Sequence, residues 1–336
     1  MIGRSVPGPA GAAFVLLLLG AGAWWFFSAE LADRPAGSVV IDVPVRMEGG
    51  NRTRTGSDST PVASVVLTPW LDAPDPELTE DGPHGPLPKI SDNGRKPWIA
   101  YARPFDVRND RPRVAVLVTG LGLSEANTAK AIERLPSAIT LAFSPYAQKA
   151  AALTRRARAD GHEIMLVLPM ASGQFPFRDA GPAALQASLS TEDNGDRLGN
   201  VLSRTFGYVG VVGSGDSPIL SEEDSLRPVL SAIGERGLMF VGAGPPGESL
   251  VKYIAPEVGT PWAVANVILD DQLSADAIDA ALAELEAVAR DRAVALGIGR
   301  AYPVIVDRLA AWASGLSERG IALAPVSALA DRQLFP

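Results

Sequence analysis

The sequence predicts an α/β fold, namely a distorted (β/α) barrel of about seven to eight mainly parallel strands. From about residue 97 onward, short apolar runs alternate with stretches whose apolar residues recur at helical spacing. Continuous apolar runs are typical of parallel strands, because crossover helices bury both faces of a parallel sheet. Eight such runs within roughly 225 residues favour a closed or nearly closed barrel over an open sheet.

Each apolar run is a predicted strand, and the intervals contain predicted helices with identifiable ends. The strands are expected at 114–118, 138–143, 163–168, 208–212, 238–241, 264–269, 294–298 and 321–326. Ser124 and Ser274 are expected to cap the helices that follow them, because a serine hydroxyl accepts from an unpaired helical N–H. Gly161 is expected to end the helix that precedes it. Pro228 and Pro303 are expected at helix starts, where a missing N–H costs little.

The first 27 residues contain an apolar segment long enough to cross a bilayer. Residues 10–27 carry no charge and would span about 27 Å as a helix. Arg4 precedes the segment, and residues 24–27 are aromatic, as in an interfacial belt. We therefore expect a single-pass inner-membrane protein, with residues 1–9 in the cytoplasm, a transmembrane anchor at 10–27 and the C-terminal domain in the periplasm. A cleaved signal peptide is the alternative, but the residues after the run form a poor cleavage site.

Residues 28–96 differ in composition from the rest of the chain. They are rich in Pro, Gly, Asp, Ser, Thr and Arg, which is typical of a flexible linker. We expect this linker to join the membrane anchor to a folded domain at 97–336. His84 lies in the linker between Gly and Pro residues, so we expect it to be solvated.

The overall composition excludes several classes of function. The net charge is −8, so the chain lacks the broad cationic surface that nucleic-acid binding requires. The chain contains no cysteine, which excludes thiolate catalysis and thiolate metal sites. It contains two histidines, His84 and His162. His162 precedes a predicted strand, and we expect it to tie a helix to the amino end of the sheet rather than to act in catalysis.

Candidate site residues follow the predicted strands, because ligands bind at the carboxyl ends of strands in such folds. Asp270 and Asp271 are the one acidic pair there, and they could offer one carboxylate to a cation and hold the other behind it. The alternative is that one of them caps a helix while the other is solvated. No residue is identified with certainty as catalytic; the candidates are Asp216, Asp270 and Asp271. The candidate ligand-binding residues are Tyr146, Ser214, Asp216, Asp270, Arg300 and Tyr302.

Several motifs occur in an order that resembles the divergent polysaccharide deacetylase family. They include RVAVLVTGLGLS from residue 113, GHEIMLVLPM from residue 161, GYVGVVGSGDS from residue 207 and ALGIGRAYPV from residue 295. The resemblance covers about residues 98–329. It implies a distorted (β/α) barrel from a bacterial, usually envelope-located branch of the carbohydrate deacetylases.

The chain departs from that family at the positions that carry the chemistry. The resemblance implies aspartates, histidines and an Asn-Asn-His triplet at these positions, which are occupied here by Thr119, Gly120, Val167, Val212, Gly213, Ser214, Gly242 and Arg300. Metal-assisted deacetylation needs about three protein ligands on a divalent ion and a group that moves a proton. These substitutions therefore predict that neither a metal nor another cofactor is bound.

The sequence thus predicts an envelope protein linked to carbohydrate metabolism and without catalytic activity. It would bind a polysaccharide or peptidoglycan-type glycan, or an envelope protein, and would contact the membrane through its N-terminal helix. The alternative is an active deacetylase or hydrolase of acetylated polysaccharide, with a site rebuilt from Asp216, Asp270 and Asp271 as metal ligands or as acid and base. A third possibility is a spacer protein of the envelope.

Overall fold

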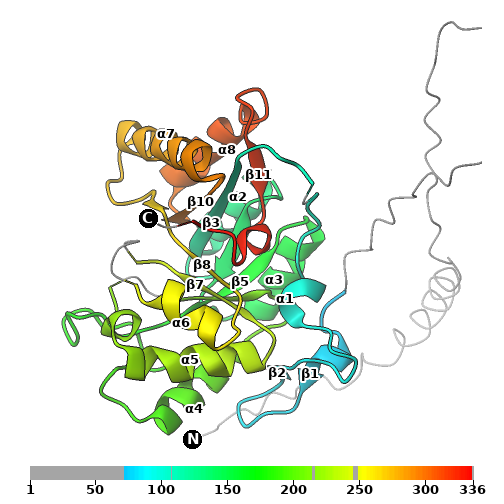
Figure 1. Cartoon of the computed structure of the whole chain (residues 1–336), viewed down its shortest axis with the longest axis vertical. Helices are drawn as coiled ribbons and strands as arrows, with labels where there is room; N and C mark the ends of the chain where they lie inside the picture. The colour runs from blue at the N-terminus through cyan, green and yellow to red at the C-terminus, as the bar shows by residue number, and fades with distance from the viewer. Residues whose placement is uncertain (1–71, 107, 214–215, 245–248, 335–336) are drawn as a thin grey trace, which may run out of the picture. The chain divides into compact units, whose positions relative to one another are not determined.

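The computed structural model describes residues 72–106, 108–213, 216–244 and 249–334. Its main sheet has nine strands, all paired in parallel, and helices lie around it (Figure 1). In spatial order the path is β8 (Trp262–Val264), β7 (Met239–Gly242), β6 (Gly210–Gly213), β5 (Ile164–Leu168), β4 (Thr140–Phe143), β3 (Arg113–Leu121), β10 (Val294–Arg300) and β9 (Val267–Ile268). The ninth strand, β11 (Ala322–Ala324), pairs with β3. The expected α/β fold with parallel strands is confirmed, and the observed sheet is curled.

The sheet curls so far that its two end strands belong to one segment. Only Ala265 and Asn266 separate β8 from β9, although β8 pairs with β7 and β9 pairs with β10. The Ala265 N–H donates to Gly242 O at 2.8 Å, whereas the Asn266 N–H donates to Leu296 O at 2.8 Å. The single strand expected at 264–269 is therefore two short strands, because the chain changes its pairing partner there.

Two apolar clusters cover the two faces of the sheet. Alternate residues of each strand point to opposite faces, so Val114 and Val116 pack with the surrounding helices while Ala115 and Leu117 face the concave side. The concave cluster also contains Leu329 from the short 3-10 helix η3 (Val326–Leu329). The C-terminal segment thus fills part of the concave side.

The side chain of Gln333 completes the hydrogen bonding of β8. Its amide Oε1 accepts from Val264 N at 2.7 Å, and its Nε2 donates to Val264 O and to Asn266 Oδ1, both at 2.7 Å. Asn266 Oδ1 in turn accepts from Leu296 N at 2.8 Å. Gln333 is only 8% exposed, so these bonds are made away from water. Two side-chain amides therefore act here as a peptide group of a neighbouring strand would.

The helices begin and end where local chemistry requires, with one exception. They are α2 (Glu125–Arg134), α3 (Ala150–Ala159), α4 (Thr191–Leu202), α5 (Glu223–Glu235), α6 (Val251–Glu257), α7 (Ala275–Arg292) and α8 (Pro303–Ser314). Ser124 and Ser274 cap α2 and α7 as expected, and Gly161 adopts φ 89° just after α3. The expectation for Pro228 is wrong, because it lies inside α5 rather than at its start. Glu222 occupies the N-cap position without a capping hydrogen bond from its side chain. Glu223 and Asp224 lie in the first turn, where the helix dipole favours carboxylates.

The domain begins earlier than the expected boundary at residue 97. Residues 72–96 form the 3-10 helix η1 (Pro76–Leu78) and a small hairpin of β1 (Thr79–Glu80) and β2 (Leu87–Pro88), followed by α1 (Pro97–Ala100). Leu78 and Leu87 are 1% and 5% exposed and belong to the concave and helix-side clusters respectively. This part of the predicted linker is therefore folded, because its two leucines enter the core. Residues 28–71 of the predicted linker lie outside the described residues.

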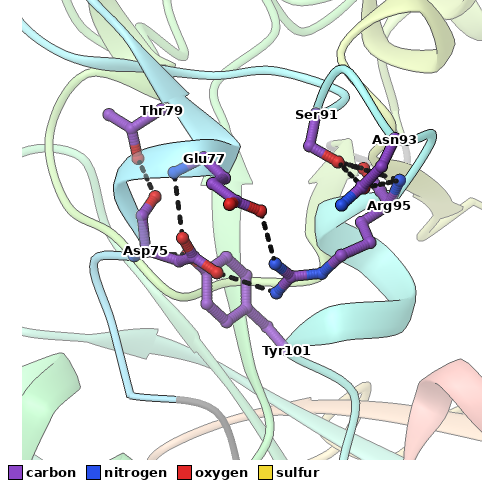
Figure 2. A network of polar contacts seen from close by, with 7 residues as sticks. All are labelled: Asp75, Glu77, Thr79, Ser91, Asn93, Arg95 and Tyr101. Atoms are coloured by element: carbon purple, nitrogen blue, oxygen red, sulfur yellow. Dashed lines mark hydrogen bonds and ion pairs between the residues drawn. The ribbon is translucent and has the colours of Figure 1, made fainter.

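A polar network fixes the hairpin segment (Figure 2). The Arg95 guanidinium contacts Asp75 Oδ2 at 2.7 Å and Glu77 Oε2 at 3.0 Å. Tyr101 Oη accepts from the Asp75 N–H at 3.0 Å, and Ser91 Oγ accepts from the Arg95 N–H at 2.9 Å. The Glu77 N–H bond and the guanidinium together lower the pKa of Asp75.

The expected membrane location requires a correction. Among the described residues, no helix combines the length and the apolar character that a membrane crossing needs. The structure therefore contradicts the expected inner-membrane protein with a periplasmic domain. The anchor expected at 10–27 lies outside the described residues.

Candidate functional site

The candidate site lies at the carboxyl end of the concave side of the sheet. Val294, Leu296 and Ile298 belong to the concave cluster, so the alternation along β10 places Arg300 on the same side. Thr119 pairs directly with Arg300 across β3 and β10. Val167 packs against the concave cluster and, like Thr119, is partly exposed, although the preceding residues of each strand are buried. The concave side thus opens to solvent at this end.

Arg300, Asp270 and Tyr302 form one contact group there. Arg300 Nε donates to Asp270 Oδ2 at 2.5 Å, and its guanidinium carbon lies 5.0 Å from the centre of the Tyr302 ring. The Asp270 side chain is 6% exposed, whereas the Arg300 side chain is 58% exposed. The hydrogen bond to Asp270 raises the pKa of Arg300. A buried carboxylate and an aromatic ring therefore hold an exposed cation in one orientation.

A catalytic divalent ion does not fit these residues. The side chains of Thr119, Val167 and Arg300 offer neither a carboxylate nor an imidazole, and the arginine adds a positive charge. Asp270, the buried carboxylate beside Arg300, is already paired with that arginine. Within the described ranges, no group of three or more His, Cys, Asp or Glu residues could hold a metal ion. The resemblance implies an acidic or histidine side chain at positions 119, 167 and 300. None of these three positions has such a side chain in this protein.

Two other candidates, Tyr146 and Asp216, contact the loop that follows β5. Tyr146 Oη donates to Ala180 O at 2.9 Å and accepts from Ala183 N at 3.2 Å, so its hydroxyl serves to hold the loop. Burial raises the pKa of Tyr146. The Asp216 carboxylate lies 3.7 Å from Arg178, and both side chains are more than half exposed.

The structure therefore brings together only part of the candidate set. Asp270, Arg300 and Tyr302 are in mutual contact, whereas no hydrogen bond or ion pair among the described residues links them to Tyr146 or Asp216. Asp271 is exposed. Ser214 lies outside the described residues.

Sequence reasoning missed two exposed aromatic side chains in the loop after β5. Phe175 and Phe177 lie in the loop after β5 and are 46% and 95% exposed. A parallel bridge between Met170 and Leu185 closes the base of this loop. The signal was present in SGQFPFRDAGP, where two phenylalanines occur among turn-forming residues directly after a strand.

The opposite end of the sheet has a structural role, as expected for His162. Its Nδ1 lies 2.8 Å from Ile139 O and its Nε2 lies 3.2 Å from Ile132 O, which joins α2 to the start of β4. The neighbouring Glu163 is fully buried and accepts from Thr140 Oγ1 at 3.0 Å and from Ser327 N at 3.1 Å. Burial raises the pKa of Glu163, and these donors oppose the rise. This buried network attaches η3 to the amino end of the sheet.

Comparison with known proteins identifies the family. A crystal structure of an uncharacterized protein from Agrobacterium tumefaciens C58 is 34% identical, with a TM-score of 0.71, and the match covers 73% of this chain and 99% of that one. An uncharacterized protein of Haemophilus influenzae is 23% identical over 207 residues, which are 61% of this chain and 72% of that protein. Residues 116–330 match the family described as divergent polysaccharide deacetylase. The chain belongs to the divergent polysaccharide deacetylase family.

Proposed function

We propose that this protein is a deacetylase-like domain without hydrolytic activity that binds a glycan at the carboxyl end of its curled sheet. The observation that carries the proposal is the Asp270–Arg300 pair at the concave opening. An arginine faces outward there, and the one buried carboxylate beside it is committed to that arginine. The Tyr302 ring is partly exposed and offers a face for sugar stacking, while Arg300 offers hydrogen-bond donors.

An active hydrolase with a rebuilt site is the weaker candidate. It needs carboxylates that converge on a reacting atom or on a metal. Asp270 is paired with Arg300, Asp216 lies beside Arg178, and Asp271 is exposed. These three side chains have separate surroundings, which argues against a common acid–base or metal function.

A protein partner in place of a glycan is the other candidate. Phe175 and Phe177 favour it, because exposed aromatic side chains are common at protein–protein interfaces. The glycan proposal and this one differ in the residues they use. A Phe177→Ser variant would weaken binding to a protein partner, whereas a Tyr302→Ala variant would weaken binding to a glycan.

Metal content and acetate release test the proposal on the full chain. The protein is stripped of metal, incubated with zinc, manganese or calcium, and analysed for bound metal per chain. We expect no stoichiometric metal and no acetate release from N-acetylated or O-acetylated oligosaccharides. One tightly bound ion that is lost in Asp270→Ala, together with acetate release, would establish the rebuilt hydrolase instead.

A further inference from the structure

We propose that Arg300 binds a carboxylate group on the glycan, so that the site selects acidic sugars. This inference rests on the proposed glycan binding and goes beyond it by naming the chemical group that is recognised. The resemblance to the family implies a histidine at position 300. This chain has an arginine there, which presents a fixed positive charge to the ligand.

The orientation of Arg300 is the first support. It is the last residue of β10, and residues two and four positions earlier, Ile298 and Leu296, face the concave side. Its Nε is held by the buried Asp270, and its guanidinium lies over Tyr302. Arginine has a long side chain with many rotamers, so a side chain fixed in advance loses less freedom when it binds a ligand.

The free donors of Arg300 are the second support. Because Nε is used by Asp270, the terminal edge of the guanidinium, formed by Nη1 and Nη2, remains for a ligand. Within the described ranges no residue accepts a hydrogen bond from either of these atoms. The Thr119 hydroxyl, on the paired position of β3, likewise makes no hydrogen bond to a described residue. Apart from its two chain neighbours, no described residue has an atom within 4 Å of the place where a Cβ of Gly120 would lie, so there is space beside it.

The local charge favours a carboxylate over a phosphate. Two parallel N–H groups on one planar edge match the two oxygens of a carboxylate. Asp270 at 2.5 Å offsets much of the arginine's charge, so a dianionic phosphate would lie near a carboxylate with only one cation to balance it. A monoanionic carboxylate carries half that charge and makes the same two hydrogen bonds.

A matched pair of disaccharides tests this inference. The probes are N-acetylglucosaminyl-N-acetylmuramic acid and its carboxamide, which differ in one group, an anionic carboxylate in the first and a neutral amide in the second. Binding of each to the full-length protein is measured by calorimetry at low and high salt, and glucosamine 6-phosphate is the probe for phosphate. We expect the acid to bind about tenfold more tightly than the amide, with the difference reduced by salt.

Variants assign the effect to Arg300. Arg300→Gln is expected to remove the preference for the acid. Arg300→Lys is expected to keep only part of this preference, because lysine cannot offer two parallel N–H groups. The Arg300→Gln change leaves Asp270 without its partner, so the double variant with Asp270→Asn provides a folded comparison. Arg134→Gln, an exposed arginine on α2, is the matched control and is expected to keep the preference.

The outcomes separate this inference from the proposed function. Equal binding of acid and amide would overturn the carboxylate subsite and leave glycan binding intact. Tighter binding of the sugar phosphate would also overturn it, in favour of a phosphate ligand. If none of the three probes binds, the proposed glycan function fails together with the inference.

Discussion

His162 shows how one buried residue makes stability depend on pH. Both ring nitrogens face backbone carbonyls, and desolvation lowers the pKa of the imidazole despite these bonds. Below about pH 6.5 the unfolded chain therefore takes up a proton that the folded chain does not. We expect His162 to lower the free energy of unfolding as the pH falls from 7.5 toward 5.5, whereas Glu163, whose pKa is raised by burial, contributes in the opposite direction.

Urea unfolding across this pH range, with proton NMR of the imidazole signals, measures the effect. The chain has only two histidines, so a His84→Gln variant leaves His162 as the single signal. That signal is expected to titrate at a lower pH than a histidine in the urea-unfolded chain. Titration of His162 at the unfolded value would contradict the prediction.

At the scale of one element, β8 depends on a side chain that lies 69 residues later in the sequence. Gln333 is the partner of both backbone groups of Val264. We expect Gln333→Met to destabilise the protein by about 2–4 kcal/mol, because a buried N–H and a buried C=O would lose their partners. Chemical denaturation measures this, and the exposed Gln272→Met is the matched control. Equal midpoints for the two variants would show that the Gln333 amide contributes little.

The elements themselves were largely predictable, and the errors have specific causes. All eight predicted strands contain observed strand residues, because buried parallel strands read as apolar runs. The apolar run at 264–269 is divided into two strands because β8 pairs with β7 whereas β9 pairs with β10. A change of partner strand does not alter the hydrophobic pattern, so the sequence does not reveal it. The prediction for Pro228 was wrong because the acidic residues at 222–224, four to six residues upstream, mark where α5 begins.

The site was only partly predictable from the strand ends. The contact of Asp270, Arg300 and Tyr302 follows from β9 and β10 being neighbours, which places their carboxyl ends together. The hydrogen bonds between the Tyr146 hydroxyl and the backbone of residues 180 and 183 were not predictable. They depend on how the long loop after β5 folds back toward Tyr146. Tertiary contacts between loops leave no periodic signal in the sequence.

At the scale of the whole molecule, residues 72–96 belong to the folded domain rather than to a linker. Leu78 and Leu87 each bury their side chains in a core cluster, and Arg236 contacts both Glu80 at 2.8 Å and Pro88 O at 3.0 Å. We expect a fragment of residues 97–336 to be less stable than residues 72–336 by roughly 3–6 kcal/mol, on the basis of two buried leucines. Denaturant midpoints of the two fragments measure the difference.

A point variant keeps this prediction testable if the shorter fragment does not fold. Leu78→Ala in the full chain is expected to cost about 2–5 kcal/mol, because it leaves a cavity in the concave cluster. The exposed Leu123→Ala serves as the control. An unchanged midpoint for Leu78→Ala would mean that the hairpin segment adds nothing to the domain.

The Gln333 amide also has a consequence for biosynthesis. While residues 265–332 are being translated, the nascent chain carries β8 with one edge lacking its final partner. Such an edge can pair with another chain. The nascent chain is therefore more open to aggregation at this edge than the finished protein, and mutations of Gln333 should reduce the yield of folded protein more than the ligand binding of the protein that does fold.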